Sequence, residues 1–75
     1  MAIEKFEEIR GFMVQGYMDD THGWIRLSDK QGNLRLYYYE SKDQKVLEGN
    51  MNKSKLAKEI AQEMINRLIA EKKAA

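Results

Sequence analysis

Alternation of apolar and polar residues is clearest over residues 23–39, GWIRLSDKQGNLRLYYY. Two alternating runs, residues 24–27 and 34–39, flank a turn-rich segment at residues 28–33, which predicts a β-hairpin. Successive residues of a strand point to opposite faces of the sheet. One face, predicted to be the core, therefore receives Ile25, Leu27, Leu34, Leu36 and Tyr38. The other face, predicted to be exposed, receives Trp24, Arg26, Arg35, Tyr37 and Tyr39.

A further strand is predicted within residues 9–18, so that a β-meander covers about residues 9–48. Turns of four residues at 19–22 and 29–32 keep apolar residues opposite one another on the inner face, which is the constraint that makes a register predictable. Gly16 indicates either a bulge or a close approach of another part of the chain to the backbone. On the exposed face these turns predict the cross-strand pairs Tyr17–Trp24, Gln15–Arg26, Arg26–Arg35 and Trp24–Tyr37.

Two segments have no decisive pattern. Residues 1–8 contain Ile3 and Phe6 among charged residues and are interpreted as a lead-in, either a helical turn or a frayed end. Residues 45–48 are long enough for a short fourth strand, with Leu47 inward beside Tyr38, or for a plain connection to the next element.

The C-terminal segment predicts a long amphipathic helix over about residues 53–73, with Asn52 as its N-cap. No proline or glycine interrupts it, and Lys72 and Lys73 complement the helix dipole at its end. The apolar stripe is wider than one sheet face needs, so either the N-terminal segment or a second copy of the chain is expected to cover its edge. The stripe consists of Leu56, Ala57, Ile60, Ala61, Met64, Ile65, Leu68 and Ile69.

Together these elements predict one small α+β domain, a three- or four-stranded antiparallel β-meander with one long C-terminal α-helix packed on one face. The 75 residues provide enough chain for a single core. Hydrophobic residues make up 43% and charged residues 33% of the sequence, and no apolar run is long enough to span a membrane. The absence of cysteine and of a secretory signal favours a cytoplasmic location and excludes a disulfide framework.

The predicted exposed face is the strongest functional signal. Aromatic rings beside guanidinium groups suit single-stranded nucleic acid, whose bases stack and whose phosphates need cations. Tryptophan, tyrosine and arginine are also enriched where proteins bind one another, and a cross-strand aromatic cluster can simply be structural. We expect a non-enzymatic nucleic-acid-binding module or, as the alternative, a protein-interaction module or inhibitor, including a homodimer, that uses this face or the helix edge. The candidate residues are Gln15, Tyr17, Trp24, Arg26, Arg35, Tyr37 and Tyr39.

Other chemistry receives little support from the sequence. The net charge of +1 is not the strongly basic balance of a domain that binds duplex nucleic acid mainly through phosphates. His22 lies beside Asp19 and Asp20, but neither zinc-site nor EF-hand spacing is present. No catalytic or nucleotide-binding motif occurs, so we expect no enzymatic activity, no metal site and no cofactor.

Overall fold

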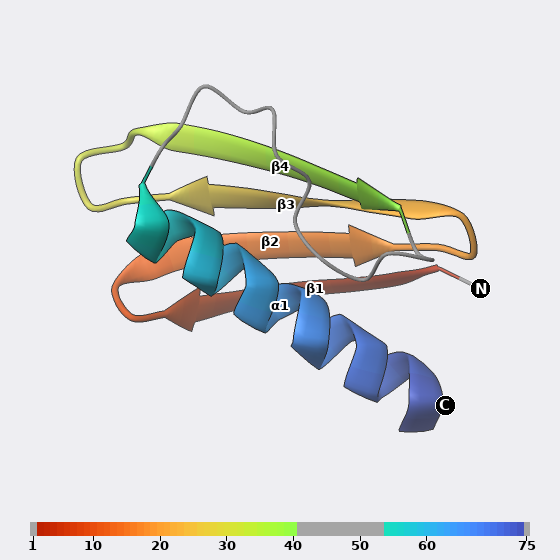
Figure 1. Cartoon of the computed structure of the whole chain (residues 1–75). Helices are drawn as coiled ribbons and strands as arrows, with labels where there is room; N and C mark the ends of the chain where they lie inside the picture. Colours follow the sequence, from red (N-terminus) through yellow and green to blue (C-terminus); the bar gives the residue numbers. More distant parts are fainter. Residues whose placement is uncertain (1, 41–53, 75) are drawn as a thin grey trace.

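The computed structural model describes residues 2–40 and 54–74. Within them the chain forms four strands and one helix: β1 (Ile3–Ile9), β2 (Phe12–Met18), β3 (His22–Ser28), β4 (Leu34–Glu40) and α1 (Lys55–Ala74). The strands form one antiparallel sheet in the order β1-β2-β3-β4, and the helix crosses one face of it, packing against β1, β2 and β3 (Figure 1). The predicted α+β meander with a C-terminal helix on one face is confirmed.

Strand β1 corrects the interpretation of residues 1–8 as a lead-in. Its residues pair with β2 from Ile3 opposite Met18 to Ile9 opposite Phe12. A two-residue turn joins the strands, and both of its residues have positive φ, 50° at Arg10 and 89° at Gly11. Two positive φ values in succession are typical of the turns that match the twist of a tight hairpin. The predicted short strand at residues 45–48 lies outside the described residues.

Charged residues at inward positions made this strand difficult to predict from the sequence. Lys5 and Glu7 take inward positions of β1, but at the sheet edge, where partners from the helix meet them. Lys5 Nζ lies 2.8 Å from Glu71 Oε2, and Arg67 Nη1 donates to Glu7 Oε1 at 2.9 Å. An edge strand can therefore carry charges on its core side, because side chains from a distant segment pair with them.

The register between β2 and β3 is the predicted one. Tyr17 pairs with Trp24, and Gln15 pairs with Arg26. The turn is closed by a backbone hydrogen bond from Asp19 N to His22 O at 2.9 Å. The carboxylate of Asp19 also accepts hydrogen bonds from the backbone N–H groups of Thr21 and His22, both at 2.9 Å. This Asx-type capping explains the turn-forming sequence of residues 19–22.

The predicted register between β3 and β4 is wrong by one residue. The pairs are Ser28–Leu34, Leu27–Arg35, Arg26–Leu36, Ile25–Tyr37 and Trp24–Tyr38, because the loop has five residues, 29–33, rather than four. The Asp29 carboxylate accepts from the backbone N–H groups of Gln31 and Asn33, each at 2.9 Å, and Gly32 adopts a φ of 84°. Side-chain capping therefore stabilises the longer loop, and the extra residue moves every β4 side chain to the opposite face.

The helix begins at Lys55 and is capped by Ser54. The Ser54 hydroxyl accepts from the backbone N–H of Ala57 at 3.2 Å, and the Ser54 carbonyl accepts from that of Lys58 at the same distance. Asn52, the predicted cap, lies outside the described residues. Lys72 and Lys73 occupy the last turn as expected.

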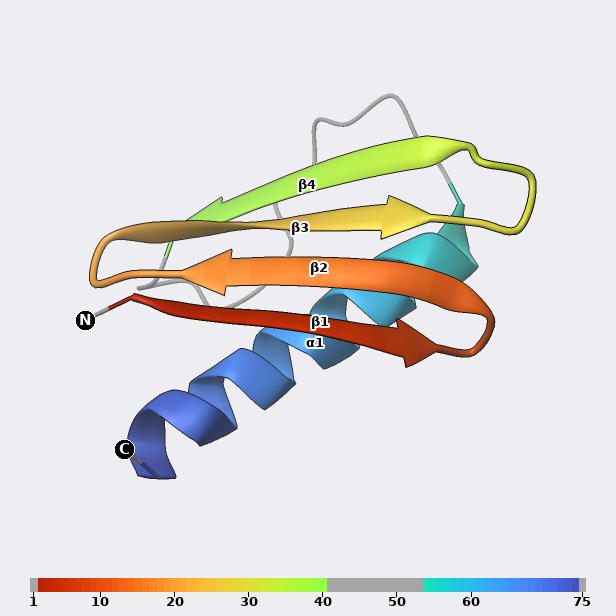
Figure 2. The same ribbon diagram turned by 180° about the vertical axis from the view of Figure 1, so that it is seen from behind.

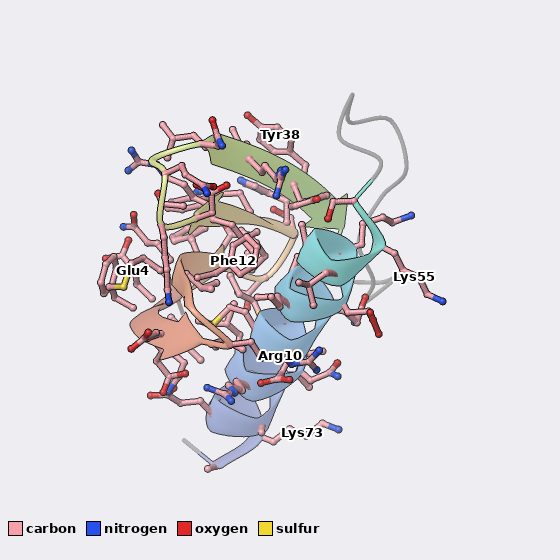
Figure 3. All side chains as sticks on the ribbon, turned by 90° about the vertical axis from the view of Figure 1, so that its left-hand side faces the viewer. Glu4, Arg10, Phe12, Tyr38, Lys55 and Lys73 are labelled. Carbon is pink, nitrogen blue, oxygen red and sulfur yellow. The ribbon has the colours of Figure 1, made fainter. Side chains whose placement is uncertain are left out.

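Helix and sheet share one core, and Phe12 lies between the two layers (Figure 3). Gly16 allows the close approach, because a Cβ atom there would lie 2.7 Å from Met64 Cγ and 3.0 Å from Leu68 Cδ1. Ile3 and Ile69 pack at the core margin, so part of the N-terminal segment covers the wide helix stripe as expected, whereas Phe6 and Leu56 are exposed. The buried residues are Ile9, Val14, Met18, Ile25, Leu27, Tyr37, Ala57, Ile60, Ala61, Met64, Ile65 and Leu68.

Candidate interaction face on the sheet

The face of the sheet opposite the helix is the candidate site, and we call it the outer face. Figure 2 views the sheet from this side, and helix α1 lies behind the strands in that view. The strand registers arrange its residues in three rows of four. In the order β1 to β4, the rows are Glu4–Tyr17–Trp24–Tyr38, Phe6–Gln15–Arg26–Leu36 and Glu8–Met13–Ser28–Leu34.

Exposed apolar side chains gather on this face. Six large hydrophobic residues are exposed in the described part of the chain, and five of them belong to the outer face. The sixth, Leu56, is on the helix. Burying such side chains in an interface is favourable, and a concentration of exposed apolar side chains on one face commonly marks a contact with another molecule. The five are Phe6, Met13, Leu34, Leu36 and Tyr38, with exposed fractions of 63%, 43%, 58%, 38% and 55%.

Two of the aromatic rings on the central strands stack on each other. Tyr17 and Trp24 are stacked, with ring centroids 5.8 Å apart and an angle of 14° between the planes. The Tyr17 hydroxyl donates to Asp19 Oδ2 at 2.9 Å, and this bond to a carboxylate raises the pKa of the phenol. The hydrogen bond and the stacking hold Tyr17 in place, so one face of each ring is already in contact with its neighbour.

Arg26 is the only cation within the three rows and lies next to Gln15 in the middle row. One hollow beside it, of about 190 Å³, is lined by Arg26, Leu34, Arg35 and Leu36. Another, of about 100 Å³, is lined by Phe6, Met13, Gln15, Arg26 and Ser28. The rows also carry two carboxylates, Glu4 and Glu8, both on the β1 edge, so their net charge is slightly negative. Figure 3 shows Glu4 on the side of the sheet away from the helix.

The structure brings together four of the seven sequence-predicted site residues. Gln15, Tyr17, Trp24 and Arg26 share the outer face. Arg35 and Tyr37 do not, because the register shift of β4 turns them to the helix side, where Tyr37 is 1% exposed and belongs to the core. The predicted pairs Arg26–Arg35 and Trp24–Tyr37 therefore do not form. Tyr39 pairs with Gly23 in the ladder, and its side chain is outside the described set.

The sequence-based prediction missed the five exposed apolar residues of the outer face. Leu34, Leu36 and Tyr38 were assigned to the core by the four-residue loop, and Phe6 was left in the N-terminal lead-in. Met13 was placed on the correct face but not singled out. A signal for β1 did exist in the sequence: Arg10-Gly11 is a two-residue turn between segments of equal length, and Gly is favoured where φ is positive.

The Asp19 loop has a structural role that accounts for its composition. Besides the turn bonds, Asp20 lies 3.1 Å from Lys72 Nζ, and His22 Nδ1 lies 2.9 Å from Thr21 Oγ1. Among residues 2–40 and 54–74, no three histidine, cysteine or acidic side chains are grouped as metal ligands would be. The same residues include no helix with the length and apolar character needed to cross a membrane.

Comparison with known proteins gives no match: no family model fits the chain, and no curated protein or solved structure is significantly similar to it. The function must therefore be inferred from the geometry and chemistry of the outer face.

Proposed function

We propose that this protein is a non-enzymatic protein-interaction module that binds its partner through the outer face. The observation that supports this most directly is the concentration of exposed large apolar residues on one face, five of the six in the described part of the chain. In a small two-layer domain the helix buries one face of the sheet, and the uncovered face is normally polar. Here seven of the twelve residues in the three rows are apolar or aromatic.

The composition of the face fits a protein partner. Aromatic residues, methionine and arginine are the types enriched at protein interfaces, and lysine is depleted there. Trp24, Tyr38 and Arg26 represent those types, and no lysine occurs in the three rows. The two hollows beside Arg26 provide concave sites between protruding side chains, as a shape-complementary contact requires.

A matched pair of variants tests the proposal. Leu36→Lys places a charge in the middle row of the outer face, on the edge strand β4, whereas Leu56→Lys makes the same change on the helix at similar exposure, 38% against 44%. The immobilised full chain and both variants are used to capture proteins from the source cells, and any protein captured is identified by mass spectrometry and tested again in purified form. Loss of binding by Leu36→Lys but not by Leu56→Lys supports the proposal. Equal binding by all three chains contradicts it.

Nucleic-acid binding is the second candidate function. It is favoured by the neighbouring Tyr17, Trp24, Arg26 and Gln15 on the two central strands, where bases and phosphates would find rings and a cation. The structure gives this candidate fewer groups than the sequence predicted, because Arg35 and Tyr37 are on the other face. One cation beside two carboxylates gives little attraction for a polyanion.

The single tryptophan distinguishes the two candidates. Trp24 fluorescence is titrated with a short oligothymidylate and with a short duplex, each at low and at physiological salt. Quenching that salt reverses would favour nucleic acid, since phosphate contacts weaken steeply as salt rises. An unchanged emission spectrum leaves the protein-interaction proposal as the better explanation of the face.

A further inference from the structure

We infer that the occupant of the outer face is a second copy of this chain, packed face to face about a twofold axis that runs parallel to the strands. This inference rests on the proposed function and names its partner. A twofold interface places the same patch of both copies in contact, so the patch must be complementary to itself. The rows of the outer face determine which residues meet when the axis runs across the strands and which meet when it runs parallel to them.

An axis lying across the strands is unfavourable. It would set each strand against the same strand of the second copy, so that Arg26 would face its own equivalent near the centre of the contact. Two guanidinium groups facing each other in a desolvated contact repel, and none of the described outer-face neighbours of Arg26 is acidic.

An axis parallel to the strands avoids this head-on contact, because it sets the two Arg26 side chains diagonally across the axis, each with Gln15 of the other copy opposite it. It sets β1 against β4 of the second copy and β2 against β3. In the middle row Phe6 then faces the second copy's Leu36, and Gln15 faces the second copy's Arg26. The first contact is apolar on both sides. In the second, the amide oxygen of Gln15 is an acceptor for the guanidinium. Because the dimer has twofold symmetry, each of these contacts occurs twice in the interface.

The row that contains Trp24 is also compatible with this axis. Tyr17 faces the second copy's Trp24, and Glu4 faces the second copy's Tyr38, whose phenol can donate to the carboxylate. In the remaining row Met13 faces Ser28, and Glu8 faces Leu34 at the end of the sheet, where water has access. Packed sheets are rotated by about 30° because each is twisted, so the middle row determines the pairing best.

The size of the face sets the expected strength of association. A strand of seven residues spans about 24 Å, and four strands span about 19 Å, so the flat area is roughly 450 Å² before side-chain relief is added. Stable interfaces bury about 800 Å² on each partner. The flat area is little more than half of that value, so a dimer through this face should be weak and should dissociate on dilution.

Sedimentation of the full chain from micromolar to millimolar concentration tests the inference. We expect a reversible monomer–dimer equilibrium. Phe6→Glu and Leu36→Lys should each raise the dissociation constant at least about tenfold, and Leu56→Lys should leave it unchanged. Circular dichroism establishes that each variant is folded, and both outer-face positions are exposed, which favours folding.

A mixture of the two outer-face variants tests the axis itself. In a heterodimer of Phe6→Glu with Leu36→Lys, the introduced carboxylate would face the introduced ammonium at one site, and native leucine would face native phenylalanine at the other. The mixture should therefore dimerise more tightly than either variant alone. An axis across the strands would give no such rescue, so absence of rescue overturns the proposed geometry.

The remaining outcomes overturn self-association without deciding the proposed function. A chain that stays monomeric at every concentration has no second copy on this face, while capture of a different protein that depends on Leu36 would still support an interaction module. A dimer that neither outer-face variant weakens uses another surface. Salt-reversible quenching of Trp24 by oligothymidylate in a chain that remains monomeric would assign the face to nucleic acid.

Discussion

Tyr37 pairs with Ile25 across strands β3 and β4, and both side chains are buried on the face that carries helix α1. The neighbouring pair, Trp24 and Tyr38, lies on the opposite face. Adjacent tyrosines of one strand therefore have different roles: Tyr37 fills the core, and Tyr38, which is 55% exposed, belongs to the outer face.

Alanine substitution of the two tyrosines distinguishes the observed register from the one that a four-residue loop would produce. Tyr37→Ala should lower the free energy of unfolding by about 3–5 kcal/mol, because it leaves a cavity in the core. Tyr38→Ala is the matched control and should cost less than about 1 kcal/mol in the monomer. Urea unfolding of both variants at low concentration makes the comparison, and the reverse order of stability would refute the register.

The contact between Gly16 and the helix makes a second prediction. Gly16→Ala should destabilise the fold by roughly 1–3 kcal/mol, because the new methyl group would overlap Met64 Cγ and press on Leu68. If that overlap is the cause, the same substitution should cost less in a Met64→Ala background, where room has been made. A double-mutant cycle by urea unfolding measures the difference. An equal cost in both backgrounds would mean that another effect, such as a backbone change, is responsible.

Stability at acid pH should depend on the Asp19 turn. Backbone N–H groups of His22 and Thr21 donate to this carboxylate and hold its pKa well below its ordinary value of 3.8. A pKa that is lower in the folded state stabilises the fold above the ordinary value and loses this contribution as pH falls below it. Asp19→Asn keeps the shape and removes the charge.

We therefore expect Asp19→Asn to be less stable than the native chain at neutral pH and to lose less stability between about pH 4 and pH 2. Thermal unfolding across this range measures how the stability of each chain changes with pH. The pH dependence of Asp19→Asn should be reduced rather than abolished, because the pKa values of Glu7, Asp20 and Asp29 are also lowered by their hydrogen bonds. Parallel curves for the two chains would show that the turn bonds do not favour the charged form of Asp19.

The two arginines of the central hairpin should act independently. Both residues line the hollow beside Leu34 and Leu36, but Arg26 pairs with Leu36 on the outer face and Arg35 pairs with Leu27 on the helix side, so they are not a cross-strand pair on one face. The stability effects of Arg26→Ala and Arg35→Ala should then add to within about 0.5 kcal/mol. Chemical unfolding of the two single variants and the double variant tests this. Stabilisation by each single variant, with a double variant that gains less than the sum of the two, would indicate the repelling pair that the four-residue loop predicts, because either substitution alone removes the repulsion.

Patterns within single elements were sufficient to predict much of this fold. The spacing of Ile60, Met64 and Leu68 predicts the helix and its buried side, and the turn residues around Asp19 fix the β2–β3 register. These features are local, because a helix period and a short capped turn depend on residues close together in the sequence. The sequence also placed Gln15, Tyr17, Trp24 and Arg26 on one face correctly.

The face of β4 and the inclusion of β1 were decided by tertiary structure. In β4 the more hydrophobic alternating set is Leu34, Leu36 and Tyr38, so hydrophobicity alone favours the wrong face. The Asp29-capped loop of five residues turns Tyr37 to the core instead. In β1 the inward Lys5 and Glu7 break the apolar pattern of a strand. The structure accommodates them because Glu71 and Arg67 of the helix form ion pairs with them. The sequence by itself thus determined the elements whose reasons are local, while contacts between distant residues and one extra loop residue decided which side chains form the outer face.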